Sequence, residues 1–127
     1  MKTWDEMSRD DFENWVQGYL KAWKTNQRND IEALFTEDAT YLTQAFRQPW
    51  RGREMIVEGW LSRAEWQGIW DFEYHWVAIE GNAGVLEGLT RYHTQGAAYN
   101  NIWVIVLNEE GRCREFREQW VQKPEAE

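Results

Sequence analysis

The spacing of apolar residues changes from a helical period in the first half of the chain to a period of two in the second half. Six apolar residues fall at i, i+3, i+4, i+7, i+8 and i+11 and form one face of a helix: Phe12, Trp15, Val16, Tyr19, Leu20 and Trp23. Ser8 and Asp11 form a capping-box pattern at its start, and the helix is expected to run to about Lys24. From Trp70 to Ala78, aromatic and apolar residues instead alternate with polar ones. The pattern therefore predicts helices first and a β-meander afterwards.

Shorter patterns predict the remaining elements. Asn29-Asp30 is typical of a helix cap and predicts a short second helix. A third helix is expected from about Gly52 to Trp66, after a loop over residues 44–51 that contains Pro49. Strands are expected over residues 38–43, 70–78, 84–93, 98–107 and 113–121, the last two joined by a hairpin loop at 108–111. The order α-α-β-α-β-β-β-β indicates the α+β class.

Length and charge narrow the possible partners. The 127 residues fit one domain over 1–127 without a linker or repeat, and residues 124–127 are expected to form a loose tail. Ten tryptophans exceed what a core of this size needs, so some are expected to line a cavity or an interface. The net charge of −8 argues against binding nucleic acid and against docking on an anionic membrane.

Targeting and metal patterns are also missing from the sequence. It shows neither a secretory signal nor an apolar stretch of membrane-spanning length, which predicts a cytoplasmic location. Cys113 is the single cysteine, so no disulfide and no cysteine-based zinc site are expected. His75, His93 and Cys113 form no recognised metal spacing. We therefore expect no metal and no cofactor.

Four segments carry a resemblance to a known superfamily. They are residues 19–23, IEALFTEDAT at 31–40, FRQPWRGREMI at 46–56 and EGRCREF at 110–116. Their order and spacing resemble the nuclear-transport-factor-2-like superfamily, in particular its SnoaL-like branch. The resemblance implies N-terminal helices packed in the concave face of a strongly bent, mostly antiparallel sheet, around a conical pocket, and commonly a homodimer. It implies no single function, because members include isomerases, cyclases, dehydratases, epoxide hydrolases and proteins without catalysis.

The ketosteroid isomerases of that superfamily offer the sharpest enzymatic interpretation. Their chemistry needs an aspartate base at the end of the first strand, a tyrosine on the first helix and a protonated aspartate on the penultimate strand. Tyr19 matches the tyrosine, but the base position is Thr43 and the second donor position is Trp103. A threonine hydroxyl does not take a proton from carbon near neutral pH, and an indole N–H only donates. Ketosteroid isomerisation is therefore not expected.

Alternation along the strands identifies the residues expected to face the pocket. If Trp103 points inward, the inward set on the last three strands is Leu86, Gly88, Thr90, Tyr92, Tyr99, Asn101, Ile105, Leu107, Phe116, Glu118 and Trp120. On residues 70–78 the inner set is Trp70, Phe72, Tyr74, Trp76 and Ala78. The predicted ligand-binding residues are Tyr41, Thr43, Trp60, Thr90, Tyr92, Asn101, Trp103, Phe116 and Trp120, with Glu118 and Tyr19 as candidate catalytic groups.

Glu118 is the most informative member of this set. A carboxylate among tryptophans and phenylalanines is desolvated, which raises its pKa and suits it to act as an acid or base. Alternatively it is a buried carboxylate satisfied by a tryptophan N–H, a tyrosine, Asn101, or an arginine at the rim (Arg51 or Arg53). A one-residue error in strand register would turn it outward. Tyr19 is either a donor to a ligand carbonyl or a core aromatic. Thr43 and Thr90 are more simply explained as packing residues with local hydrogen bonds.

The outward face of the predicted strands combines charged and apolar residues. His75 and His93 fall on it, and the charged residues expected to pair across strands are Asp71, Glu73, Glu87 and Arg91. Apolar residues share this face: Val77, Ile79, Val85, Leu89 and Val104. Apolar area on an outer sheet face favours a homodimer.

Three functional hypotheses remain open from the sequence. The first is a protein that binds a small, largely apolar or aromatic molecule. The second is a cofactor-independent isomerase, cyclase or dehydratase that uses Glu118 as acid–base group with Tyr19 or Asn101 as electrophilic partner. The third is an interaction module whose interior is filled by aromatic side chains.

Overall fold

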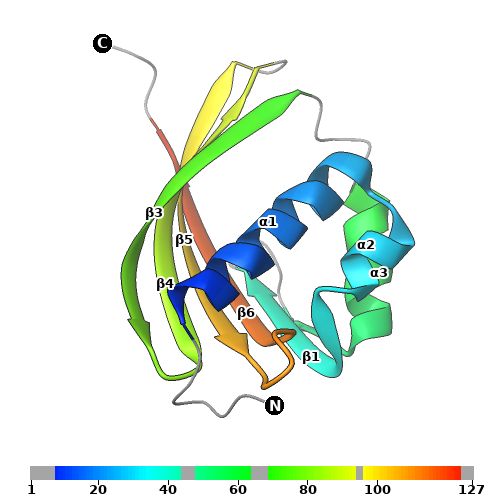
Figure 1. Ribbon diagram of the computed structural model, residues 1–127. Coiled ribbons are helices and arrows are strands. Elements are labelled where there is room, and N and C mark those ends of the chain that lie inside the picture. Colours follow the sequence, from blue (N-terminus) through cyan, green and yellow to red (C-terminus); the bar gives the residue numbers. More distant parts are fainter. Residues whose placement is uncertain (1–7, 44–47, 64–68, 94–95, 124–127) are drawn as a thin grey trace.

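The structure, a computed structural model, describes residues 8–43, 48–63, 69–93 and 96–123. In this part of the chain the elements are α1 (Arg9–Thr25), α2 (Arg28–Glu32), β1 (Phe35–Thr43), β2 (Trp50–Arg51), α3 (Arg53–Arg63), β3 (Trp70–Glu80), β4 (Ala83–Tyr92), β5 (Ala97–Leu107) and β6 (Cys113–Gln122). Figure 1 shows the strands forming a strongly curved sheet with the helices on its concave side. The predicted end of the third helix at Trp66 and the predicted tail at 124–127 lie outside the described residues.

Helix α1 forms as its periodicity predicts. The Asp11 carboxylate accepts a hydrogen bond of 2.8 Å from the Ser8 backbone N–H, which satisfies one of the free donors at the helix start. The helix ends at Thr25, and the positive φ of 52° places its C-cap residue Asn26 in the left-handed region. Its buried residues are Phe12, Trp15, Val16, Tyr19, Ala22 and Trp23, so the predicted apolar face is confirmed.

Helix α2 begins earlier than the sequence suggests. Its N-cap is Gln27 rather than Asn29. Asp30 does not cap the helix. Instead its carboxylate accepts a hydrogen bond of 2.7 Å from Thr25 Oγ1 and lies 3.6 Å from Lys21 Nζ. The Asp30 side chain, which suggested the cap, therefore contacts α1 instead of the start of α2.

Two strand predictions also need correction. β1 begins at Phe35, three residues before the predicted start at Asp38. Trp50–Arg51, in the predicted loop, forms the short strand β2 and pairs antiparallel to β1, with Trp50 opposite Tyr41. Two residues are too few to show alternation, so this pairing is visible only in three dimensions.

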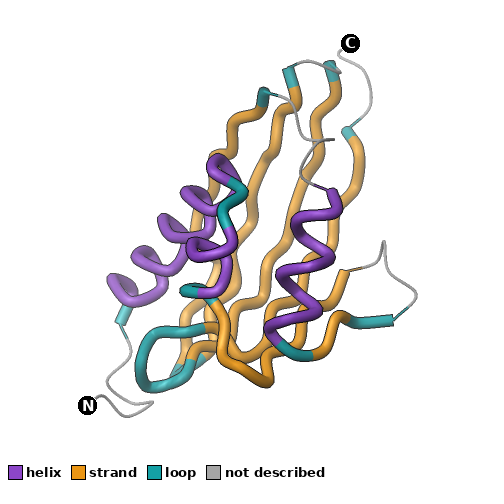
Figure 2. The backbone as a smooth tube through the Cα atoms, turned by 90° about the vertical axis from the view of Figure 1, so that its right-hand side faces the viewer, coloured by secondary structure: helices purple, strands orange, loops and turns teal. Residues whose placement is uncertain are grey.

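The sheet is mixed, with strand order β2-β1-β6-β5-β4-β3. The pairing of β1 with β6 is parallel, and the other neighbouring pairs are antiparallel. Figure 2 shows the helices lying across one face of this sheet. The predicted bent, mostly antiparallel sheet with helices in its concave face is confirmed.

A β-bulge in β3 changes which of its residues face the core, so part of the predicted inward set is wrong. Trp76 lies opposite Leu86, but Ala78 lies opposite Val85, so Val77 is the extra residue. Beyond the bulge the faces exchange: Ala78 is exposed, and Ile79 packs against the core. The predictions that Ala78 points inward and Ile79 outward are therefore wrong.

The outer face of the sheet carries the predicted charge pairs. Arg91 Nη1 lies 3.5 Å from Asp71 Oδ1 and 3.6 Å from Glu73 Oε2, and His75 Nε2 lies 3.1 Å from Glu87 Oε1.

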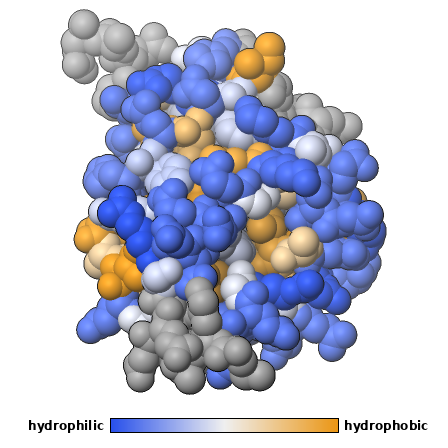
Figure 3. All heavy atoms as spheres, in the orientation of Figure 1, coloured by the Kyte–Doolittle hydropathy of each residue, from blue (hydrophilic) through white to orange (hydrophobic). Residues whose placement is uncertain are grey.

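The surface seen in the orientation of Figure 1 is mostly hydrophilic with scattered hydrophobic areas (Figure 3). Within the described part of the chain, no helix is long and apolar enough to cross a bilayer.

Candidate functional site

A group of polar side chains lies on the concave face where four strands run side by side. In the sheet register Glu118 of β6 lies opposite Thr43 of β1 on one side and Trp103 of β5 on the other. Asn101 lies two residues from Trp103 on β5, and its strand partner on β4 is Gly88, two residues from Thr90. Because residues two apart on a strand share a face, all five point inward. We call Thr43, Thr90, Asn101, Trp103 and Glu118 the inner polar cluster.

Hydrogen bonds fix the orientation of most of the cluster. Thr90 Oγ1 donates to Asn101 Oδ1 at 2.8 Å, which directs the Asn101 amide nitrogen toward β6. Asn101 Nδ2 then donates to Glu118 Oε2 at 3.1 Å, and Trp103 Nε1 donates to the same oxygen at 2.9 Å. Among the described residues, none donates to Glu118 Oε1. The carboxylate is thus held through one oxygen while the other keeps its acceptor capacity.

The surroundings of Glu118 change the proton affinity of its carboxyl group. Burial raises the pKa of this carboxyl, because desolvation penalises the charged state, and the hydrogen bonds from Trp103 and Asn101 act in the opposite direction. Trp103 is fully buried, and its ring lies 4.8 Å from that of Phe72 and 5.2 Å from that of Phe116, between centroids. An apolar wall therefore surrounds a carboxyl group whose proton affinity is increased.

Thr43 differs from the rest of the cluster. Its Oγ1 atom is buried and has no hydrogen-bond partner. A buried hydroxyl without a partner is destabilising, so native proteins rarely leave one unpaired.

Tyr19 and Tyr41 form a buried pair beside the cluster. Their hydroxyl oxygens are 2.8 Å apart, and either atom can be the donor. Burial raises the pKa of both phenols, and the Glu118 charge raises both further. The Tyr19 ring lies 4.6 Å from that of Trp103 and 5.4 Å from that of Phe116. Tyr19 is therefore a neutral hydrogen-bonding phenol and a core aromatic at once.

The other sequence-predicted site residues line the same interior less closely. The Trp60 ring lies 4.9 Å from that of Tyr19, and its indole N–H donates to Asn26 Oδ1 at 3.0 Å. Tyr92 lies farther along β4, and burial raises its pKa to about 12. Trp120 lies near the end of β6, with its ring 5.4 Å from that of Tyr99. The structure thus places the predicted residues on the concave side, while contact with a ligand stays a prediction.

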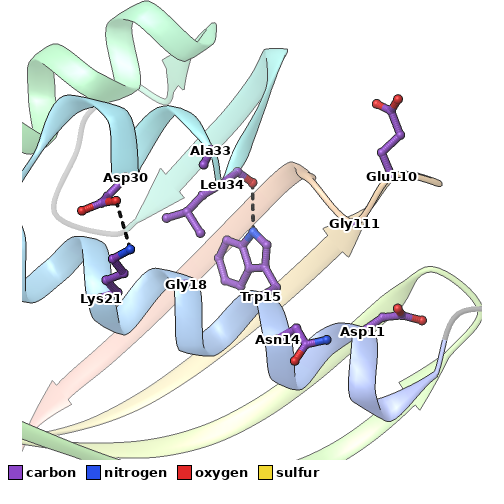
Figure 4. Close-up of a pocket in the computed structure, with 10 residues that line it drawn as sticks. All are labelled: Asp11, Asn14, Trp15, Gly18, Lys21, Asp30, Ala33, Leu34, Glu110 and Gly111. Carbon is purple, nitrogen blue, oxygen red and sulfur yellow. Dashed lines mark hydrogen bonds and ion pairs between the residues drawn. The ribbon is translucent and has the colours of Figure 1, made fainter.

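Two surface grooves were not expected from the sequence. One, of about 360 Å³, lies where α1 and α2 meet the β5–β6 turn (Figure 4), and Trp15 Nε1 donates to Leu34 O at its base. The other, of about 480 Å³, is lined by Thr36, Glu37, Arg53, Asn108, Glu110 and Arg112. Each groove is built from separate segments that share no motif, so no sequence signal marks it. Both lie outside the interior of the cone, whose pocket stays a prediction.

Metal ligands do not gather in the described part of the chain. No group of three or more His, Cys, Asp or Glu side chains there is placed to hold a metal ion. The side chains of the inner polar cluster can themselves take part in hydrogen bonding and proton transfer.

Structural neighbours share this architecture at low sequence identity. A protein of unknown function with a cystatin-like fold from Methylobium petroleophilum PM1 has a TM-score of 0.75 and 19% identity, covering 99% of this chain and 83% of that one. A putative ketosteroid isomerase from Kribbella flavida DSM 17836 has a TM-score of 0.69 and 13% identity, covering 93% and 83%. An LEH-like epoxide hydrolase from M. tuberculosis has a TM-score of 0.61 and 18% identity, covering 85% and 80%. These similarities show the fold alone.

Sequence comparison assigns the family. None of the curated proteins matches the chain. The model of the SnoaL-like domain matches residues 16–116, which include α1 from Val16 onward, the buried tyrosine pair and β6 as far as Phe116. The match and the curved sheet with its concave-face helices agree with the resemblance in the four sequence segments. The chain therefore belongs to the SnoaL-like domain family.

Proposed function

We propose that the chain binds a small, largely apolar or aromatic molecule in its cone, and that a hydrogen-bond donor of this molecule pairs with Glu118 Oε1. The observation that carries the proposal is the asymmetric use of the carboxylate. Oε2 accepts two hydrogen bonds, whereas no described residue donates to Oε1. A partly buried carboxylate is stabilised when its oxygens are paired, so a donor on a ligand would gain a strong interaction there.

Aromatic walls around the carboxylate support the choice of ligand class. The rings of Tyr19, Phe72 and Phe116 all lie within about six ångströms of the Trp103 ring. Flat aromatic surfaces of this kind favour flat apolar ligands, and a few polar groups then set orientation. The ligand thus needs an apolar body and one donor group.

Substituting Glu118 by glutamine tests the proposal sharply. Because Trp103 and Asn101 both donate to the Oε2 position, they would hold the amide oxygen there and leave the amide N–H₂ at the Oε1 position. Glu118→Gln would thus convert an acceptor into a donor without changing shape. β-Naphthol, which donates, should bind the unmodified protein at least about tenfold more tightly than the variant, since a hydrogen bond to a charged group contributes about 1.5–3 kcal/mol. Methyl β-naphthyl ketone, which only accepts, should prefer the variant.

Isothermal titration calorimetry measures both affinities. Glu115→Gln is the matched control, because Glu115 lies on the same strand and pairs with Arg117 on the surface, with an N–O distance of 2.8 Å. This control should leave both affinities unchanged. Equal affinities of the Glu118→Gln variant and the unmodified protein for each probe would contradict the proposal. Failure of every naphthyl probe to bind would favour the interaction module with a filled interior.

A second candidate function has one specific observation in its favour. The raised pKa of Glu118 would suit a general acid or base, and the neutral Tyr19 hydroxyl would suit an electrophilic donor. This combination supports a cofactor-independent isomerase, cyclase or dehydratase. The test is turnover of hydroxy and keto compounds by the unmodified protein and by Glu118→Gln. Activity that survives the substitution would exclude Glu118 as the acid–base group.

We further propose that the outer sheet face pairs with a second copy of the chain. Three apolar side chains on this face are strongly exposed: Val77 by 60%, Ile102 by 45% and Val121 by 68%. They lie on the outer face of β3, β5 and β6, so one interface could cover them together. Light scattering at micromolar concentration should give twice the monomer mass, and Ile102→Lys should halve it. The control Met55→Lys, on α3, should stay dimeric, and a monomeric unmodified protein would refute the proposal.

A further inference from the structure

We infer that the polar group of the bound molecule is a hydroxyl, held between Thr43 and Glu118. This inference rests on the proposed function and adds the chemical class of the ligand. Its starting point is Thr43 Oγ1, a buried atom with no hydrogen-bond partner. Because the Thr43 hydroxyl is unpaired, it does not itself bond to the neighbouring carboxylate.

The sheet brings the two unpaired groups to the same place. Thr43 and Glu118 are register partners in the parallel pairing of β1 with β6. Residues opposite each other on neighbouring strands project from the same face of a sheet, with the strands about 4.8 Å apart. The preceding inward pair, Tyr41 and Phe116, confirms the face, since these rings lie 4.8 Å apart in the core. One ligand atom on the concave face could therefore lie within reach of both Thr43 Oγ1 and Glu118 Oε1.

The bonding capacities of the two groups select the ligand atom. An ionised carboxylate only accepts hydrogen bonds, so the atom facing Glu118 must donate. The Thr43 hydroxyl can accept as well as donate, but its buried hydrogen stays unsatisfied unless it meets an acceptor, so an atom that also accepts satisfies it fully. A hydroxyl oxygen does both. A carbonyl or an ether only accepts, and the lone pair of an aromatic amine is delocalised into its ring.

Within the inner polar cluster, Thr43 Oγ1 and Glu118 Oε1 are left without a hydrogen bond, whereas the other polar atoms named above are paired. Thr90 and Asn101 satisfy each other, and Asn101 and Trp103 satisfy Glu118 Oε2. A valine at position 43 would have the shape of threonine without the unpaired hydroxyl. A hydroxyl kept unpaired beside an acceptor with spare capacity is therefore assigned to ligand binding.

Two probes and two variants test the inference. β-Naphthol carries a hydroxyl, and β-naphthylamine carries a donor of similar size that accepts poorly. Thr43→Val should weaken β-naphthol binding by about three- to tenfold, the range expected for one neutral hydrogen bond, and leave β-naphthylamine binding unchanged. Thr40→Val is the control, because Thr40 lies on the opposite face of β1, and it should change neither affinity.

The outcomes separate this inference from the proposed function. If both probes bind and depend on Glu118, but Thr43→Val does not weaken β-naphthol binding, the hydroxyl assignment is wrong and the proposed function stands. If Thr43→Val weakens both probes equally, Thr43 acts through a bound water or through packing, and the assignment is again wrong. If neither probe binds the unmodified protein, the proposed function and the inference fail together. Circular dichroism of both variants confirms that each is folded.

Discussion

Thr43→Val is predicted to stabilise the ligand-free protein. The substitution replaces a buried hydroxyl that has no hydrogen-bond partner with a methyl group of the same shape. Burying an unsatisfied polar group costs about 1–3 kcal/mol, so its removal should raise the free energy of unfolding by about 1–2 kcal/mol. Valine is also among the residues that favour strands, and position 43 lies at the end of β1.

Thermal and urea unfolding measure this gain. For a chain of this length, 1 kcal/mol corresponds to about 4 °C in Tm, so the predicted increase is about 4–8 °C. The urea midpoint should rise without a change in slope, because the surface exposed on unfolding stays the same. Thr40→Val, on the opposite face of the same strand, should change the free energy of unfolding by less than about 0.5 kcal/mol.

A loss of stability would refute the reasoning. If Thr43→Val lowers the free energy of unfolding while Thr40→Val does not, the Thr43 hydroxyl has a partner in the folded protein. The hydroxyl-binding inference would then lose its starting point. A gain in stability combined with weaker β-naphthol binding would show a residue retained for binding at the expense of stability.

Three further substitutions probe the site and its support. Burial raises the pKa of Glu118 above its ordinary 4.5, so the folded protein loses stability as the pH rises from 4.5 through the raised pKa. Glu118→Gln removes this loss, so the stability of the variant relative to the unmodified protein, measured by urea unfolding, should grow from acidic to neutral pH. A difference in stability that does not change with pH would contradict this prediction. Gly88→Ala would place a Cβ 2.5 Å from the ring of Phe72, so it should lower the free energy of unfolding by about 1–3 kcal/mol in a urea titration, and an unchanged midpoint would count against this packing. Glu13→Ala removes a carboxylate that accepts hydrogen bonds from two aromatic side chains of β3, so amide hydrogen exchange should accelerate in β3 more than in β5. An equal acceleration in both strands would show that the hydrogen bonds to Glu13 do not stabilise β3.

Much of the fold could be predicted because local patterns and tertiary contacts agree. The apolar face of α1 and the alternation in β4, β5 and β6 have long, regular periods, so a single register satisfies them. The exchange of faces at Ala78 and Ile79 could not be predicted, because a bulge adds one residue without changing composition. The cap of α2 was misplaced for a related reason, since Asp30 pairs with side chains of α1 instead.

Less of the candidate site follows from the sequence. The inward position of Glu118 could be predicted from alternation, and so could its proximity to Asn101 and Trp103 on the neighbouring strand. The use of Oε2 alone could not be predicted, because it depends on the side-chain conformations that direct both donors to one atom. Nor could the unpaired state of Thr43, whose position beside Glu118 arises from the parallel pairing of β1 and β6, strands far apart in the sequence.

Titration of the Glu118 side-chain carboxyl carbon by NMR tests the central claim most directly, with Glu118→Gln used to assign the signal. A carboxylate desolvated by the aromatic interior and held through one oxygen should titrate above the ordinary value of 4.5. Added β-naphthol should move the midpoint downward, because a donor at Oε1 favours the charged form. A midpoint at or below 4.5 that β-naphthol leaves unchanged would contradict the claim.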